Sequence, residues 1–288
     1  MNFENKIIDN VVQNLLNGKD YRSEILNVMN ARFFDFSLDF FKKIVIAKMS
    51  NGSINLEWYR NYFINGNYKP DESAIFAGIN KKTITNIYGS ATKSIVLDVA
   101  NANFTYLSNM VNQLEEDVSS GLDVVLSLSY NDITVRLTLS ESLIVVNALA
   151  TKKLQMKGSV WSSIGKQVEK PLIDKMCDLL KVPLNNRNPN FVYDSSKSFD
   201  REYDYKLVSN SNKTYKIELK LVGKGNPENS DAAFARDTQL LIADTLSIQS
   251  KNQLKSEGIQ FVELHNNPNS LLDFYNILQS FDIPSFFN

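Results

Sequence analysis

The chain has 288 residues, of which 43% are hydrophobic and 22% charged, a composition typical of a soluble globular protein with a packed core. It contains one histidine and one cysteine, which excludes zinc fingers, paired-histidine metal sites and disulfide frameworks within one chain. The same count excludes nucleases that need two histidines and any Cys-His dyad other than Cys177 with His265. The lone cysteine, the polar N-terminus and the lack of a long apolar run predict a cytoplasmic protein with no membrane span.

The formal net charge of -1 hides an uneven distribution of charged residues. Residues 151–230 contain 15 Lys and Arg against 9 Asp and Glu, whereas residues 1–150 contain 13 against 16 and residues 231–288 contain 3 against 7. DNA binds more tightly to clustered Lys and Arg because its backbone is a dense array of phosphates. The basic segment therefore favours an anionic partner such as DNA, although charge on a solvated surface also varies this much by chance.

The first 150 residues are expected to be mostly helical, with irregular parts. In chain order, the expected elements are an amphipathic helix over 7–16, an aromatic-rich helix over 33–49, loops with short elements over 51–82, a helix over 92–116 and a hairpin over 122–139 that closes near Asn131-Asp132. The 1–150 region is interpreted as one domain that serves recognition, dimerisation or both.

From residue 159 onward, strand-like and helical patterns alternate. An apolar face formed by Ile164, Val168, Leu172, Met176 and Leu179 predicts a helix to about Lys181, bent at Pro171. After it we expect strands near 191–193, over 201–209 and over 214–222, a glycine-rich loop over 223–227, a helix from about 230, a strand over 240–244, a helix over 248–257, a strand over 259–264 and a helix over 270–281. This order predicts an α/β (α+β) fold in which residues 151–288 form a mixed central sheet flanked by helices.

The strand over 214–222 carries two of the candidate catalytic residues. Strand alternation places Glu218 and Lys220 on one face, and pairing across the turn brings Asp204 close to Glu218. Two carboxylates supply oxygen ligands for Mg²⁺, and the lysine beside them can orient or deprotonate a water, which indicates phosphodiester hydrolysis. Glu202 shares the face of Asp204 and competes with it for the metal. An exposed Glu-Lys pair on a solvated sheet face is the alternative explanation.

These residues resemble a known nuclease core. Asp204 followed by Glu218-x-Lys220 in a hairpin, after a helix containing Glu169, resembles the PD-(D/E)xK core, and the strings REYD and IELKLVGKGNPE are similar to type II restriction endonucleases of the CfrBI family. The resemblance covers roughly residues 159–264, and it departs from the pattern at Tyr203, where a proline is expected. It implies that Asp204 and Glu218 are metal ligands, that Lys220 is the catalytic lysine and that Glu169 joins the metal site directly or through water.

The resemblance also implies an activity and partners. The expected function is Mg²⁺-dependent, sequence-specific hydrolysis of double-stranded DNA that leaves 5′-phosphate ends, by a homodimer that reads a palindromic site, in a host that carries a cognate DNA methyltransferase. Two alternatives stay open: a DNA repair or recombination nuclease of the same superfamily, and a non-catalytic DNA-binding protein whose hairpin carboxylates are only surface charges.

Several further residues are candidates for contact with DNA. Lys224 and Asn226 lie in the glycine-rich loop, whose backbone N–H groups are open to phosphate, and Arg236 follows this loop and either contacts DNA or supports the active site. A plain turn and a surface ion pair are the respective alternatives. Aromatic side chains between Trp58 and Phe63 either stack on bases or pack beneath a loop. His265 is expected to be a loop histidine, and Cys177 a buried, inert side chain.

Overall fold

The protein is described from a computed structural model, which covers residues 3–51, 54–117, 125–188, 203–221, 233–234 and 236–287. The chain forms two compact units: unit 1 comprises residues 1–28 and 161–288, and unit 2 comprises residues 29–160. The division into functional domains at residue 150 stays a prediction, and the first 28 residues group with the C-terminal part. Within the described ranges, no helix is both long and apolar enough to cross a membrane.

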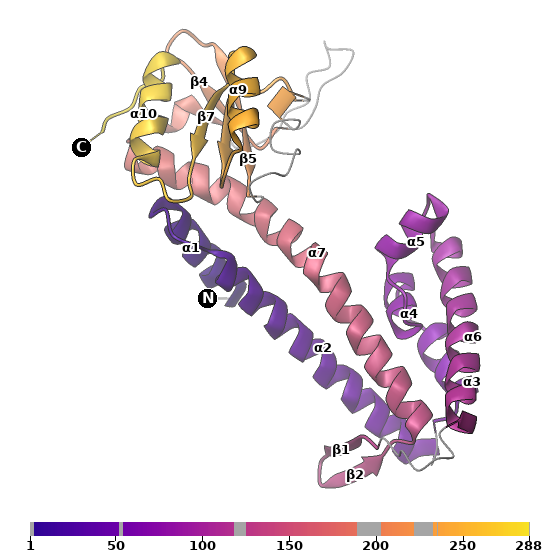
Figure 1. The fold of residues 1–288 in the computed structure, drawn as a ribbon. Coiled ribbons are helices and arrows are strands. Elements are labelled where there is room, and N and C mark those ends of the chain that lie inside the picture. The colour runs from indigo at the N-terminus through magenta and orange to yellow at the C-terminus, as the bar shows by residue number, and fades with distance from the viewer. Residues whose placement is uncertain are drawn as a thin grey trace. The chain divides into compact units, whose positions relative to one another are not determined.

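A five-stranded mixed sheet lies at the centre of unit 1 (Figure 1). Its strands, in spatial order, are β3 (Arg187–Asn188), β4 (Tyr205–Val208), β5 (Thr214–Lys220), β6 (Leu240–Ala243) and β7 (Gln260–Glu263). The pairs β3–β4 and β4–β5 are antiparallel, and β5–β6 and β6–β7 are parallel, as crossover connections require. The predicted mixed sheet is confirmed. The strand expected near 191–193 and most of the helix expected from 230 lie outside the described residues.

Helices cover both faces of this sheet. The helix α9 (Ile248–Ser256) joins β6 to β7, and its Leu254 packs in one apolar cluster with Leu241 and Ala243 of β6. The helix α10 (Ser270–Ser280) contacts β7. On α7 (Leu139–Leu179), Asp174 accepts a hydrogen bond of 2.5 Å from Tyr205 Oη, which ties this helix to β4. The sheet is therefore buried on both sides, and α9 and α10 confirm the expected helices.

The helix α7 differs from its prediction in two ways. It begins at Leu139 and not near 159, because Ile144, Val145 and Ala148 already follow helical spacing and are buried in the core of unit 2. Four of the five residues predicted on its apolar face in unit 1 are fully buried, but Leu179 is 46% exposed. The helix ends there, and the next residue, Leu180, is buried instead.

Unit 2 is mostly helical, as expected, around an aromatic core. Its helices are part of α2 (Arg22–Asn51), then α3 (Leu56–Tyr59), the π-helix η1 (Arg60–Ile64), α4 (Pro70–Phe76), α5 (Lys81–Tyr88), α6 (Lys93–Asp117) and the first part of α7. The buried rings of Phe40, Phe63 and Phe76 lie within 5.4 Å of one another, centroid to centroid. These contacts hold the short helices together.

Residues 51–82 contain loops that join short elements, as expected, and these elements are α3, η1, α4 and the start of α5. The turn-forming residues of this segment also serve as helix starts. The side chain of Asn55 accepts from Trp58 N, that of Asn80 accepts from Thr83 N, and Pro70 occupies the first turn of α4. Asn and Pro mark both turns and helix N-termini, so composition alone did not separate the two.

The predicted hairpin is confirmed. β1 (Ser127–Tyr130) pairs antiparallel with β2 (Ile133–Arg136), with Tyr130 opposite Ile133. The two turn residues have φ values of 48° (Asn131) and 63° (Asp132), as a two-residue type I′ turn requires.

The connection between α1 (Phe3–Leu16) and α2 lies against the carboxyl ends of the parallel strands. Asn266 N donates to Gly18 O at 3.2 Å, and Tyr21 Oη donates to Leu221 O at 3.3 Å. Arg22 Nη2 lies 2.5 Å from Oδ2 of Asp244, the residue that follows β6. The predicted helix over 7–16 is confirmed, and these contacts explain why it belongs to unit 1.

Candidate active site

The two predicted metal ligands meet where β4 begins. The register pairs Tyr205 with Ile217, so Asp204, one residue before β4, lies opposite Glu218. Leu219 N donates to Asp204 Oδ2 at 2.9 Å, which fixes the aspartate against β5. The approach of Asp204 to Glu218, expected from the hairpin, is therefore present.

Glu218 and Lys220 are neighbours on one face of β5. Lys220 Nζ lies 2.6 Å from Glu218 Oε1 and 4.0 Å from Asp204 Oδ2. The side chain of Glu218 is completely buried and that of Lys220 is 21% exposed. The alternative of an exposed Glu-Lys pair on a solvated face is wrong, because a buried carboxylate needs a specific partner and is expensive to keep without one.

Arg236 enters the same cluster from the segment before β6. Its Nη1 lies 2.5 Å from Glu218 Oε1 and 3.3 Å from Asp204 Oδ1. A single guanidinium nitrogen thus bridges the two carboxylates. In this structure Arg236 supports the cluster, as one of its two predicted uses required, while contact with DNA stays a prediction.

Burial and charge shift the pKa values in this cluster. Burial, and then the negative charge of Asp204, raise the pKa of Glu218, while Lys220 and Arg236 oppose the shift. Burial favours the neutral form of Arg236, but Glu218 and Asp204 outweigh this effect and raise the pKa of the guanidinium. Glu218 Oε2 is buried and has no hydrogen-bond partner among the described residues. The carboxylate therefore has an unused ligand atom that faces no solvent.

Glu169 on α7 lies within the electrostatic range of this cluster. Burial and the negative charge of Asp204 raise its pKa to about 7, and Lys220 acts in the opposite direction. No hydrogen bond joins Glu169 to the other residues of the cluster within the described part of the chain. The structure places Glu169 beside the site, and a role in holding a metal, direct or through water, stays a prediction.

The donor atoms fit a divalent cation of the Mg²⁺ type. Asp204 Oδ1 and Glu218 Oε1 already converge on one cationic nitrogen, and Glu218 Oε2 lacks a partner among the described residues. In the described ranges, no group of three or more His, Cys, Asp or Glu residues is arranged to hold a metal ion. Two carboxylates suffice for Mg²⁺, because it commonly keeps several waters and takes oxygen ligands from substrate phosphate.

Three other candidates cannot be placed. Lys224 and Asn226, the predicted DNA contacts in the glycine-rich loop, lie outside the described residues, as does Glu202, the competitor of Asp204. Their roles stay predictions.

A second buried ionic cluster escaped the sequence analysis. Asp244 is fully buried, pairs with Arg22, and has its Oδ1 3.9 Å from His265 Nδ1. Burial raises the pKa of Asp244 although Arg22 and His265 lower it. The 222 positions that separate Arg22 from Asp244 left no local signal by which to pair them. His265 follows β7 in a loop, as expected, and Cys177 is buried, as expected.

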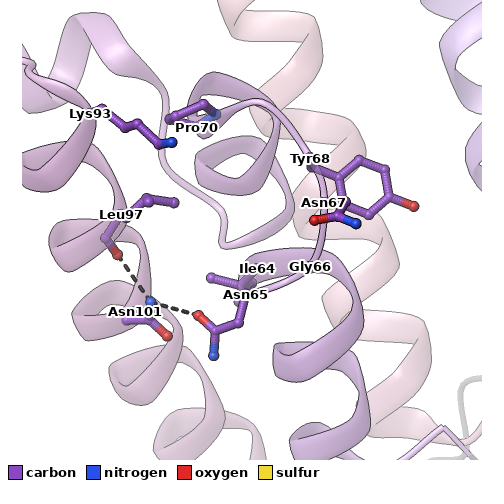
Figure 2. Close-up of a pocket in the computed structure, with 9 residues that line it drawn as sticks. All are labelled: Ile64, Asn65, Gly66, Asn67, Tyr68, Pro70, Lys93, Leu97 and Asn101. Atoms are coloured by element: carbon purple, nitrogen blue, oxygen red, sulfur yellow. Dashed lines mark hydrogen bonds between the residues drawn. The ribbon is translucent and has the colours of Figure 1, made fainter.

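The aromatic candidates of unit 2 belong mainly to its core. Tyr59 and Phe63 are buried, which confirms the packing alternative for these two, while Tyr62 is 44% exposed and stacks on Trp58 at 4.7 Å. Beside them is a hollow of about 490 Å³, shown in Figure 2. It is lined by Ile64, Asn65, Gly66, Asn67, Tyr68, Pro70, Lys93, Leu97 and Asn101.

Comparison with known proteins bears on most of the chain. The model of the CfrBI restriction endonuclease family matches residues 5–251. No curated protein and no solved structure matches the chain. The match covers most of both units, and it includes Asp204, Glu218 and Lys220.

Proposed function

The chain belongs to the CfrBI restriction endonuclease family and is thus an endonuclease that cleaves DNA, and on this premise we propose that it is a Mg²⁺-dependent type II enzyme. It hydrolyses double-stranded DNA at a specific site and leaves 5′-phosphate ends. The observation that supports this proposal best is the convergence of Asp204, Glu218 and Lys220 at one end of β5.

Each residue of the cluster has its own role in phosphodiester hydrolysis. Asp204 and Glu218 would hold Mg²⁺, which supplies positive charge to the phosphate oxygens and lowers the pKa of a bound water. Lys220, whose Nζ contacts Glu218, orients the attacking water and offsets the negative charge that develops on the phosphate. Glu169, with its pKa near 7, accepts or donates a proton at the edge of the site.

The remaining features of the proposal follow from the DNA substrate. A palindromic site is read by two identical subunits, so we propose a homodimer. We also propose that the enzyme works in the cytoplasm and that a cognate methyltransferase protects the host DNA. The DNA-binding residues proposed in the nuclease unit are Lys224, Asn226 and Arg236.

The test is digestion of plasmid and phage DNA of known sequence with Mg²⁺, followed by sequencing of the ends. The wild type yields discrete fragments with 5′-phosphates. Asp204→Asn, Glu218→Gln and Lys220→Ala each remove roughly a hundredfold or more of the activity, because each removes a group that acts at the reacting phosphate. The control Lys213→Ala removes an exposed lysine at the other end of β5 and cuts like the wild type.

Three outcomes would contradict parts of this proposal. A smear, or products only at structured junctions, would favour a repair or recombination nuclease. Metal-independent DNA binding without hydrolysis would favour a non-catalytic role. Undiminished cutting by all three variants would overturn the assignment of Asp204, Glu218 and Lys220.

A further inference from the structure

A groove lies in unit 2 between α5 and residues 154–159 of α7. Its volume is about 710 Å³. It is lined by Asn80, Lys82, Thr83, Asn86, Leu154, Gln155, Lys157, Gly158 and Ser159. Both walls belong to the same compact unit, so the groove does not depend on how the two units are arranged.

The lining has the chemistry of an anion-binding surface. It contains two lysines and no carboxylate, and neither Lys82 nor Lys157 forms an ion pair within the described ranges. The amides of Asn86 and Gln155 likewise make no hydrogen bond to other described residues. Lysine ammonium groups bind phosphates, and a side-chain amide offers the donor and the acceptor that a base edge requires.

Two other large hollows of unit 2 lack this combination. One is lined by the carboxylates of Glu57, Glu115 and Glu141, which repel phosphate. The hollow in Figure 2 has one lysine, and its Asn101 Nδ2 already donates to Asn65 Oδ1 at 2.9 Å and to Leu97 O at 3.1 Å. Of these three hollows, the groove at α5 is the one that joins two lysines to two amides, all without partners in the described part of the chain.

We propose that this groove binds the DNA substrate, with Lys82 and Lys157 on backbone phosphates and Asn86 and Gln155 on base edges. The inference rests on the proposed function, and it assigns to unit 2 a share in sequence recognition. It also assigns a DNA-binding role to the start of the basic segment, because Lys157 belongs to residues 151–230. The competing occupant is a second copy of this chain, since Leu154 in the groove is 67% exposed.

The lysines are tested by DNA binding without catalysis. The affinity for a fluorescent 30-base-pair duplex is measured by anisotropy in EDTA, over a series of salt concentrations. Each phosphate contact contributes about 0.9 to the slope of log affinity against log salt, so Lys82→Gln/Lys157→Gln lowers the slope by about two units for each subunit that binds the duplex. Lys213→Gln removes one exposed lysine in unit 1 and leaves the slope unchanged.

The amides are tested by the pattern of cutting. Asn86→Ala/Gln155→Ala keeps the slope but cuts at additional sites, with roughly tenfold or greater loss of discrimination between the specific site and sites that differ by one base pair. Lys82, Asn86 and Lys157 are exposed and Gln155 is partly exposed, so thermal unfolding of these variants should match the wild type.

The outcomes separate this inference from the proposed function. An unchanged slope in the lysine variant overturns the groove as a DNA site, whether or not the wild type cuts specifically. Undiminished discrimination in the amide variant overturns its contacts with bases. A change in subunit assembly on light scattering, with DNA binding intact, shows that a second copy occupies the groove and also overturns the proposal. Failure of the wild type to cut, with the slope change present, contradicts the proposed function alone.

Discussion

Nη1 of Arg236 lies 2.5 Å from Oε1 of the buried Glu218, so a cationic side chain occupies the point on which the proposed metal ligands converge. The same nitrogen lies 3.3 Å from Asp204 Oδ1. Without a metal, Arg236 offsets the repulsion between two carboxylates that would otherwise face each other in a buried site. A divalent cation held by the same oxygens must displace this guanidinium.

Arg236→Gln should therefore change the response of the protein to Mg²⁺. The unfolding midpoint of the metal-free protein should fall by roughly several degrees, because two buried carboxylates lose a cation. Saturating Mg²⁺ should raise the midpoint more in this variant than in the wild type. Differential scanning fluorimetry with and without Mg²⁺ measures both shifts, with the exposed Arg136→Gln as control. Equal Mg²⁺-induced shifts in the variant and the wild type would show that Arg236 does not compete with the metal.

Glu169→Gln should change stability in a way that depends on pH. The pKa of Glu169 is raised to about 7 from its usual value of 4.5, so the folded state holds this proton more tightly than the unfolded state. The wild type thus loses stability at this position as the pH rises from about 4.5 to 7. Glutamine does not titrate and removes this loss. The free energy of unfolding of the variant, relative to that of the wild type, should therefore rise between pH 4.5 and pH 7. Urea unfolding without metal at pH 4.5 and pH 8 measures it, and a pH-independent difference would contradict it.

Arg22→Met should weaken unit 1. It leaves the fully buried Asp244 without its cation, and the free energy of unfolding at pH 8 should fall by roughly 3 kcal/mol, the lower end for a buried pair because Arg22 is 35% exposed. Burial already raises the pKa of Asp244, and loss of Arg22 raises it further.

The loss caused by Arg22→Met should also depend on pH. A carboxyl whose pKa is raised by folding destabilises the fold when charged, and the effect is relieved as the pH falls through the folded pKa. Urea unfolding at pH 5 and pH 8 should therefore show the smaller loss at pH 5. An equal loss at both pH values would mean that Asp244 does not titrate in this range.

Glu141→Ala should weaken unit 2. Glu141 is buried, accepts hydrogen bonds from Ile54 N at 3.0 Å and Thr138 N at 2.7 Å, and pairs with Lys48, which is itself mostly buried. Its removal leaves these donors and the ammonium unpaired, so we expect a loss of about 3–5 kcal/mol in the free energy of unfolding. Chemical denaturation measures this loss, and the exposed Glu57→Ala, expected to have little effect, is the control.

The sequence predicted the strands, the hairpins and the approach of Asp204 to Glu218 to the extent that these depend on local pattern. Alternation over 214–222 and the short turn before it determine which side chain lies opposite which, so Asp204 and Glu218 were paired correctly. The helix over 92–116 and the hairpin at Asn131-Asp132 carry equally local signals and are confirmed.

What the sequence did not predict depends on contacts between distant residues or on ambiguous signals. The pairing of Arg22 with Asp244 has no periodicity to reveal it, and the central position of Arg236 in the cluster depends on a chain path through the segment before β6. The short elements expected within 51–82 were not identified as helices because Asn and Pro start helices as well as turns. The groove at α5 is made by two segments about 70 positions apart, and no motif marks it.

The discontinuity of unit 1 has a consequence for the order in which a ribosome releases the chain. Residues 29–160 are contiguous, so unit 2 can complete its contacts while synthesis continues. Tyr21 and Arg22 emerge early, but their partners Leu221 and Asp244 are made about 200 residues later. The N-terminal segment therefore cannot form these contacts until most of the chain has been made. A nascent or truncated polypeptide that ends before β6 carries an incomplete nuclease unit.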